Sequence, residues 1–285
     1  TLASSSSDNR ACYRNGIRLC CAFFFGSTSY LRLPALRELE LELSFPIEGA
    51  TPIRLEQDGF LRRFDVAGIL WPTGYLLSLC LSVPVQCGIY SDLYHAVKSA
   101  QFYPVAVELG AGIGAPAIAL AQTLNRMGHI VAPRVIATDK APSALALAIA
   151  NSYAASHHHS VDVALLDHFD IAKLKHFKRQ YAPDGGFSIV LGSSLQALFD
   201  GTEKEDHSLW KILDNLLTES NRHAIAILAH TTETLKECPQ SEFERLRVIS
   251  GNMFGMNTRY GDTSDFEISV FRRRQELFDD INDEL

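Results

Sequence analysis

The chain contains an apolar run that passes directly into a glycine-rich turn. Residues 105–114 read V-A-V-E-L-G-A-G-I-G, and a helix-like segment follows at once. Gly110 and Gly112 permit backbone conformations that other residues avoid, and the start of a helix offers free N–H groups. In open α/β sheets such turns lie at the carboxyl ends of strands, where ligands bind. We therefore expect Gly110, Ala111 and Gly112 to contact a ligand.

The segments around this turn alternate between buried-strand and helix patterns. Short apolar runs recur, and each is followed by a longer stretch with helical periodicity. This alternation is typical of a mainly parallel sheet with helices on both faces, so the fold class is α/β and Rossmann-like. The expected strands are 104–109, 134–138, 161–166, 187–191 and 223–229, and the expected helices are 114–126, 142–155, 171–181 and 209–219.

The N-terminal part of the chain follows another pattern. Residues 31–45 and 53–57 alternate apolar and charged side chains, which predicts a β extension ahead of the main sheet. A helix is expected at 75–81, with Pro72 near its first turn, and residues 82–104 are interpreted as a linker. We expect residues 1–29 to be a low-complexity segment that lies outside the domain.

The C-terminal part is expected to close the sheet. Residues 242–249 predict a helix. The segments 253–258 and 265–271 predict a hairpin around Gly261 and Asp262, whose residue types favour turns. With no internal repeat and no shift in composition, residues 30–285 are expected to form a single domain.

Composition narrows the class of protein. The net charge of −7 argues against nucleic acid as the main partner, and no apolar run is long enough to span a membrane. The six scattered cysteines predict a reducing compartment, the cytoplasm or the nucleus. Residues 1–26 are rich in Ser with three arginines, so organelle targeting is the lesser alternative. The histidines at 157–159 lack supporting ligand spacing, so we expect no metal site.

Two acidic residues indicate the kind of ligand. Glu108 lies near the end of the first strand, where a cationic partner would offset the cost of burying a carboxylate, although Glu108 could instead be structural. Asp139 follows the second strand and could accept hydrogen bonds from ribose hydroxyls, cap the next helix, or both. The glycines also fit a dinucleotide pattern, but the interval to Asp139 exceeds the about 20 residues expected there. A positively charged adenosyl ligand, S-adenosylmethionine (SAM), fits these residues better than NAD.

In these motifs the chain resembles the class I methyltransferase family that includes protein-lysine methyltransferases related to the nicotinamide N-methyltransferase group. The resemblance runs from about residue 53 to residue 271. It implies a SAM cofactor, a seven-stranded sheet with a reversed final strand, and methyl transfer to a protein lysine. The motifs that carry it, in order, are Ile53–Gln57, Gly68–Pro72, Val107–Gly114, Ala137–Asp139, Leu165–Asp167 and Ile189–Gly192.

The resemblance also implies which residues line the cofactor pocket. Trp71 could instead be a core aromatic, and Asp167 a loop carboxylate. The family usually has Trp at the position of His168. The implied pocket residues are Trp71, Gly110, Ala111, Gly112, Asp139, Asp167, His168 and Ser193.

The chain departs from the family after the fourth strand of the resemblance. There it reads Ser193-Ser194-Leu195-Gln196-Ala197, so Ser194 replaces an acid. Ala197 replaces an aromatic residue, unless Phe199 takes that place from two residues further on. A lysine acceptor, with a pKa near 10.4 in solution, must be held as the neutral amine. The candidates for this task are Ser194, Gln196 and His230, the last of which could equally be structural.

Three functions therefore stay open from the sequence. The first is a SAM-dependent methyltransferase acting on a protein lysine or, failing that, on a small-molecule amine. The second is a cofactor-binding module without activity, suggested by Ser194 and Ala197. The third is an NAD-dependent oxidoreductase, which would need a Tyr–Lys or Cys/His set after the fourth strand that the sequence does not show.

Overall fold

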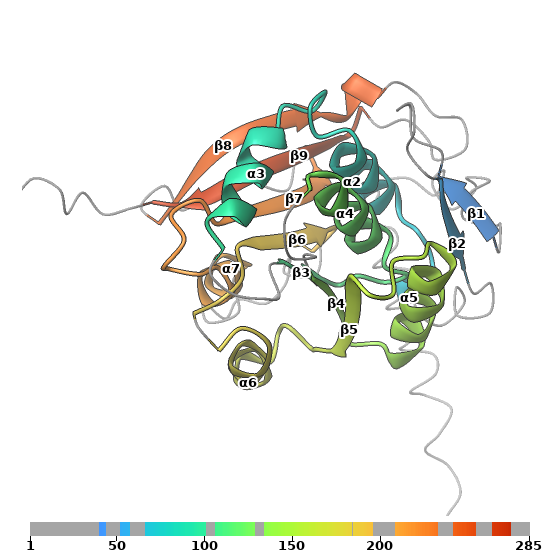
Figure 1. Ribbon diagram of the computed structural model, residues 1–285, viewed down its shortest axis with the longest axis horizontal. Coiled ribbons are helices and arrows are strands. Elements are labelled where there is room, and N and C mark those ends of the chain that lie inside the picture. The colour runs from blue at the N-terminus through green and yellow to red at the C-terminus, as the bar shows by residue number, and fades with distance from the viewer. Residues whose placement is uncertain are drawn as a thin grey trace, which may run out of the picture.

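A computed structural model of the chain describes residues 40–43, 52–57, 66–100, 106–128, 134–183, 185–195, 209–232, 242–254 and 264–274. Its centre is a seven-stranded sheet with the order β5-β4-β3-β6-β7-β9-β8 (Figure 1). The strands are β3 (Ala106–Leu109), β4 (Val135–Asp139), β5 (Val161–Leu165), β6 (Ile189–Ser193), β7 (Ile225–Thr231), β8 (Phe243–Ser250) and β9 (Phe266–Arg273).

The sheet is parallel except at one edge. β3 lies between β4 and β6 and is parallel to both, so that Glu108 is paired with Ala137 on one side and Leu191 on the other. β9 runs antiparallel to β7 and to β8. The predicted fold class, a mostly parallel seven-stranded sheet with a reversed final strand, is thereby confirmed.

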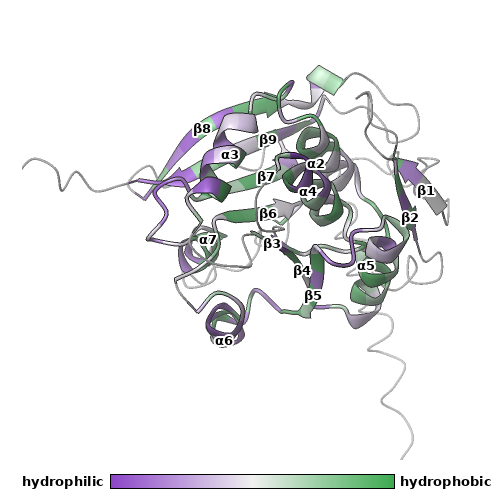
Figure 2. Ribbon diagram, in the orientation of Figure 1, coloured by the Kyte–Doolittle hydropathy of each residue, from purple (hydrophilic) through white to green (hydrophobic). Residues whose placement is uncertain are grey.

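Helices cover both faces of this sheet, and each face has its own core. The helices are α2 (Pro72–Ser82), α3 (Tyr90–Lys98), α4 (Ala115–Arg126), α5 (Pro142–Ala154), α6 (Ile171–Tyr181) and α7 (Leu209–Leu216). Side chains of α2, α3 and α4 pack on one face, and those of α6 and α7 on the other. Figure 2 shows β6 and β7, in the middle of the sheet, in mostly hydrophobic colours. Across the described helices, no segment combines the length and apolar character needed to cross a membrane.

A small antiparallel sheet of β1 (Glu40–Leu43) and β2 (Ile53–Glu56) confirms the predicted N-terminal β extension. Asn151 of α5 attaches it to the main body. Its side-chain oxygen accepts a hydrogen bond from Glu56 N (2.6 Å), and its amide donates to the carbonyl of Ile113 (2.9 Å). The extension is therefore linked through one buried side chain to the glycine-rich turn.

Two expectations for secondary structure were wrong. The predicted helix at 242–249 is strand β8, which pairs with β9 in place of the predicted strand at 253–258. Gly251–Phe254 instead form a 3-10 helix, and residues 255–258 lie outside the described residues. Only Phe243 and Ile249 are buried in β8, so the spacing of its apolar residues distinguishes poorly between a helix and a strand. Its pairing with β9 makes this segment a strand. Glu244, for example, pairs with Arg272 across the two strands (2.6 Å).

The second wrong expectation was the linker at 82–104, which contains helix α3. Only Leu93, Ala96 and Val97 of α3 are buried, so its apolar stripe is too narrow to stand out in the sequence. The other predicted helices and strands are present with small shifts, and β6 begins at Ile189 rather than residue 187. Residues 1–29 and the Gly261-Asp262 turn lie outside the described parts of the chain.

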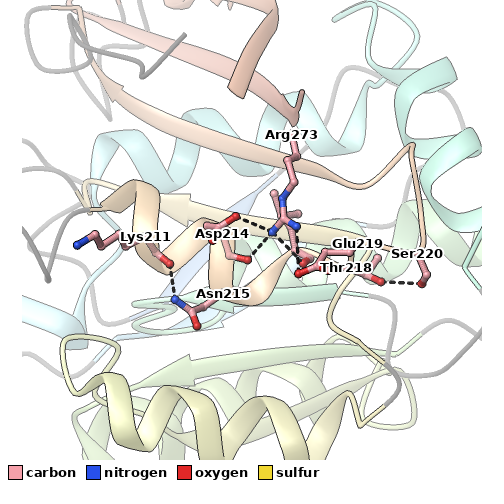
Figure 3. Close-up of polar contacts among 8 residues, drawn as sticks. Lys211, Asp214, Asn215, Thr218, Glu219, Ser220 and Arg273 are labelled. Carbon is pink, nitrogen blue, oxygen red and sulfur yellow. Dashed lines mark hydrogen bonds and ion pairs between the residues drawn. The ribbon is translucent and has the colours of Figure 1, made fainter. Parts of the chain in front are cut away.

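The end of β9 is fastened to α7 by one arginine. Arg273 forms ion pairs with Asp214 (2.8 Å) and Glu219 (3.4 Å), and it also donates to the carbonyl of Asp214 (Figure 3). This cluster holds α7 against the reversed part of the sheet.

Candidate functional site

The glycine-rich turn joins β3 to α4 in a conformation that requires glycine. Gly110, Gly112 and Gly114 have φ values of 61°, 52° and 83°, in the left-handed region. A Cβ on Gly112 would lie 2.9 Å from the carbonyl oxygen of Ala67, in the 3-10 helix Val66–Gly68. The turn is closed by a hydrogen bond from Gly114 N to the carbonyl of Ala111 (2.8 Å). Any side chain at position 112 would therefore be both strained and obstructed.

Asp139, at the end of β4, is bonded to this turn. Its carboxylate accepts hydrogen bonds from Gly112 N (2.9 Å) and from Ala141 N at the start of α5 (2.9 Å). The residue is 6% exposed. The helix-start contact that the sequence allowed as one alternative is present. Contact of Asp139 with a ribose stays a prediction.

Glu108, in β3, is directed at the first turn of α4. One carboxylate oxygen accepts a hydrogen bond from Ala117 N (2.9 Å), and the residue is 1% exposed. The other oxygen, Oε1, is buried without a hydrogen-bond partner among the described residues. Burial raises the pKa of Glu108 well above its ordinary value, the bond from Ala117 lowers it, and the charge of Asp139 raises it further. Glu108 is thus a helix cap with one unused oxygen.

The residues implied for the adenine lie after β5. Asp167 is half-buried and accepts a hydrogen bond from Phe169 N (3.2 Å). The ring of His168 is buried, with its centroid 4.5 Å from that of Phe169. Burial lowers the pKa of His168 to about 4; Asp167 opposes this shift and Lys140 adds to it. Contact of Asp167 or His168 with an adenine stays a prediction.

Trp71 and Ser193 border the same end of the sheet from another side. Trp71 is the residue before α2, half-buried, and its carbonyl accepts a hydrogen bond from Tyr75 N (2.9 Å). Gly74, in the first turn of α2, brings that helix close to β6, because a Cβ there would lie 3.6 Å from Ser193 Oγ. The structure therefore brings α2 next to the carboxyl end of β6.

Ser194 follows β6 and has a left-handed backbone, with φ 54°. Its N–H donates to the carbonyl of Ala229 (2.9 Å). Its hydroxyl lies 2.5 Å from the hydroxyl of Thr73, which is 1% exposed. Sequence reasoning missed Thr73, although it stands within the Trp71–Gly74 segment. Gln196 and Ala197 lie outside the described residues.

His230, the other candidate for the acceptor side, is bonded to the reversed strand rather than to Ser194. Its Nδ1 lies 2.9 Å from the carbonyl oxygen of Thr231, and its Nε2 lies 3.0 Å from Ser269 Oγ in β9. Burial lowers its pKa to about 4, so the ring is neutral near pH 7. Because side chains alternate along a strand, His230 lies on the same face of the sheet as Ala226 and Leu228, which pack in the core beneath α6 and α7. The contacts of Ser194 and His230 therefore belong to different neighbours, α2 and β9.

The histidine run at 157–159 forms ring contacts: His158 stacks on Tyr153 with centroids 4.4 Å apart. Within the described ranges, no group of three or more His, Cys, Asp or Glu side chains is arranged to hold a metal ion.

No model of a known protein family matches the sequence, and no curated protein matches it. Solved structures do align with it. A candidate SAM-dependent methyltransferase from Streptococcus mutans covers 82% of this chain, at 12% identity and a TM-score of 0.45. A candidate methyltransferase complexed with SAH also covers 82%, at 12% identity and a TM-score of 0.49. This chain spans 56% of the length of each of those two chains.

A third aligned structure is a ribosomal protein L11 methylase from Lactobacillus delbrueckii subsp. bulgaricus. The alignment covers 66% of this chain and 79% of the methylase chain, at 17% identity and a TM-score of 0.38. Similarity at this level assigns no activity to this chain.

Proposed function

We propose that the chain is a SAM-dependent methyltransferase whose cofactor lies over the turn between β3 and α4. The observation that carries the proposal is the pair of buried carboxylates at the ends of β3 and β4. Glu108 and Asp139 are close enough for Asp139 to raise the pKa of Glu108, and Glu108 Oε1 has no hydrogen-bond partner within the described ranges. A nearby cation would offset this desolvation and repulsion, whereas a pyrophosphate would add to the repulsion.

The start of α4 supports the same choice between SAM and NAD. Dinucleotide-binding sheets use the free N–H groups of this helix to hold the pyrophosphate. Here Glu108 already accepts the hydrogen bond of Ala117 N, in that first turn. The geometry therefore disfavours the oxidoreductase alternative.

The residues present fit the adenosyl cofactor. A carboxylate oxygen can accept more than one hydrogen bond, so Asp139 could bond a ribose as well as Gly112 N, and Gly112 has no side chain to obstruct the approach. In this proposal the amino group is balanced by the charge of Glu108, and the adenine lies near Asp167 and His168. Trp71, Gly110, Ala111 and Ser193 complete the pocket as the family resemblance implies.

When bound, the cofactor would supply an activated methyl group, and its transfer by in-line displacement needs no metal. The chain must position the acceptor and keep its amine neutral. We assign the positioning to the hydroxyls of Ser194 and Thr73, which are held 2.5 Å apart beside the end of β6. His230 has both ring nitrogens engaged with Thr231 and Ser269, which favours its structural alternative. The proposed acceptor is a protein lysine, with a small-molecule amine as the alternative.

A second function is favoured by one observation at the same place. Ser194 stands where the family has an acid, and its hydroxyl is already bonded to Thr73. A cofactor-binding module without methyltransferase activity would have the same cofactor site and no need for a group that orients an amine.

Calorimetric titration of the chain with SAM, its demethylated product SAH, and NAD tests the cofactor. We expect micromolar binding of SAM and SAH and none of NAD. Asp139→Asn should weaken SAM binding about tenfold, because one acceptor oxygen becomes a donor. Asp162→Asn is the matched control, since Asp162 pairs with Arg134 away from the turn. Binding of NAD without SAM would overturn the proposal.

The acceptor is tested separately by incubating the chain and a cell lysate with SAM that carries a deuterated methyl group. Mass spectrometry should find labelled lysines, and Ser194→Ala should reduce the label about tenfold without changing SAM affinity. Cofactor binding with no labelled product would favour the module. Label on other residues or on small amines would replace lysine as the acceptor.

A further inference from the structure

Helix α5 presents a stripe of apolar side chains to solvent. Pro142, Ala146, Ile149, Ala150 and Tyr153 are all exposed, and Ile149 and Tyr153 keep 41% and 62% of their surface accessible. Positions 146, 149, 150 and 153 are three or four residues apart, so they lie on one side of the helix. These residues, called the α5 stripe below, form one continuous apolar surface.

The opposite side of α5 attaches the helix to the rest of the molecule. Ala144, Leu145 and Ala148 are buried there, and the buried side chain of Asn151 bonds to Glu56 of β2. Figure 1 shows α5 at the periphery of the molecule, beside β2. The helix is therefore already packed on its inner side, and the α5 stripe is not needed to fasten it.

The α5 stripe also lacks the charges that an outward helix face normally carries. α5 reads P-S-A-L-A-L-A-I-A-N-S-Y-A and contains no charged residue, in a chain that is 21% charged. α6, of similar length, carries lysine and arginine on its exposed side. An apolar outer face indicates a surface that another apolar surface covers. Two copies of an acidic chain can meet at such an uncharged face with little electrostatic repulsion.

The largest side chain of the α5 stripe is held in place before any partner binds. The ring of Tyr153 stacks on that of His158, with centroids 4.4 Å apart and an angle of 5° between the planes. An aromatic side chain that is already ordered loses less conformational entropy on association. Tyr153 is therefore suited to be the anchor of an interface.

The order of large and small residues along the α5 stripe fits a second copy of the same stripe. We consider two α5 helices that pack antiparallel about a two-fold axis between positions 149 and 150. Tyr153 then faces Ala146 of the other copy, and Ile149 faces Ala150 of the other copy. Each large side chain lies over an alanine, which allows the helices to approach closely. A parallel arrangement would place large against large and small against small.

We infer that the α5 stripe is the contact face of a homodimer, in which the α5 helices of two copies pack antiparallel. The interface is isologous, because the same residues contribute from both sides. A membrane surface fits less well, since α5 has no lysine or arginine to contact lipid headgroups. The inference is independent of the proposed methyltransferase activity.

The test is sedimentation velocity of the full chain over a range of about 1 to about 200 µM. We expect a monomer–dimer equilibrium with a dissociation constant of tens of micromolar, because one helix face buries less than the roughly 1,600 Å² of a standard interface. Ile149→Lys should weaken association at least about tenfold, since it buries an unpaired charge. Val85→Lys is the matched control, because Val85 is 67% exposed and follows α2. It should leave the dissociation constant unchanged.

A second experiment tests the antiparallel register. Ala146→Glu and Tyr153→Lys, each alone, should weaken self-association about tenfold. In an equimolar mixture of the two variants, the introduced carboxylate faces the introduced ammonium, and the remaining contact between positions 153 and 146 is native. The mixture should therefore associate about fivefold more tightly than either variant alone. Recovery on mixing also shows that both variants are folded.

Four outcomes would each overturn the inference. They are a monomer at every concentration, equal losses for Ile149→Lys and Val85→Lys, no recovery on mixing, and flotation with phosphatidylcholine vesicles that Ile149→Lys abolishes. No cofactor enters these measurements, so they neither support nor weaken the proposed function.

Discussion

The two halves of the candidate site are built in different ways. Around β3 and β4 the contacts are made over short distances in sequence: Glu108 bonds Ala117, 9 residues on, and Asp139 bonds Gly112, 27 residues back. Beyond β6 they join distant parts of the chain, because Thr73 and Ser194 are 121 residues apart. The cofactor half is thus a product of consecutive strand–turn–helix units, whereas the acceptor half exists only after the whole sheet has formed.

The halves also differ in charge. The cofactor half holds two buried carboxylates, Glu108 and Asp139. The acceptor half, as far as the structure describes it, holds the uncharged hydroxyls of Thr73 and Ser194. The neutral ring of His230 lies in the adjoining strand β7 and is bonded to Thr231 and Ser269. This difference favours a cationic ligand on one side and a neutral nucleophile on the other.

The largest effect is expected in the cofactor half, from Gly112→Ala. The new Cβ would lie 2.9 Å from the backbone oxygen of Ala67, at a residue with φ 52°. We expect the free energy of unfolding to fall by about 3 kcal/mol and SAM binding to be lost. Gly128→Ala is the matched control, since its φ is 71° and nothing lies within 4 Å of the added Cβ.

That control should lose only about 1 kcal/mol in urea denaturation, the cost of the left-handed backbone alone. Equal losses in the free energy of unfolding for the two variants would show that the close approach of Ala67 to Gly112 adds nothing to the cost of the substitution.

The next effect concerns the acid sensitivity of His230, in strand β7 next to the acceptor half. The folded pKa of His230 is about 4, below its ordinary 6.5, so the folded state binds fewer protons than the unfolded state between these values. Its stabilising contribution is therefore present above pH 6.5 and is lost as pH falls toward 4. His230→Gln should remove about 2 kcal/mol of the pH dependence between pH 7 and 4.5.

Denaturation at a series of pH values measures this dependence of stability on pH. The pKa of His168 is also lowered to about 4, so His168 adds a similar pH dependence that the His230 variant retains. An unaltered slope in His230→Gln would contradict the burial of a neutral ring.

The cofactor half could be predicted from the sequence better than the acceptor half. The turn at Gly110–Gly112 and the position of Asp139 could be predicted, because each belongs to one strand–turn–helix unit with its own pattern. Thr73 could not, because its role depends on α2 lying against the end of β6. Strand β8 was mistaken for a helix since its partner β9, not its own spacing of apolar residues, makes it a strand.

Glu108→Gln examines the charge of the cofactor half. Burial raises the folded pKa of Glu108 above the ordinary value, so the wild type loses stability as pH rises from 4.5 toward that raised pKa. The variant should lack this loss, because the amide oxygen can still accept from Ala117 N while carrying no charge. SAM affinity should fall about tenfold, whereas binding of uncharged adenosine should not change. Equal loss for both ligands would mean that Glu108 acts only as a helix cap.

The smallest effect is expected from the contact that defines the acceptor half. A double-mutant cycle of Thr73→Val and Ser194→Ala measures the coupling between the two hydroxyls. We expect a coupling energy of about 1 kcal/mol in the free energy of unfolding, as for a single neutral hydrogen bond. Thr73→Ser keeps the hydroxyl and should retain most of the coupling. Strictly additive losses of stability would mean that the 2.5 Å contact between the two hydroxyls does not stabilise the fold. The left-handed backbone of Ser194 would then have to be stabilised by other contacts.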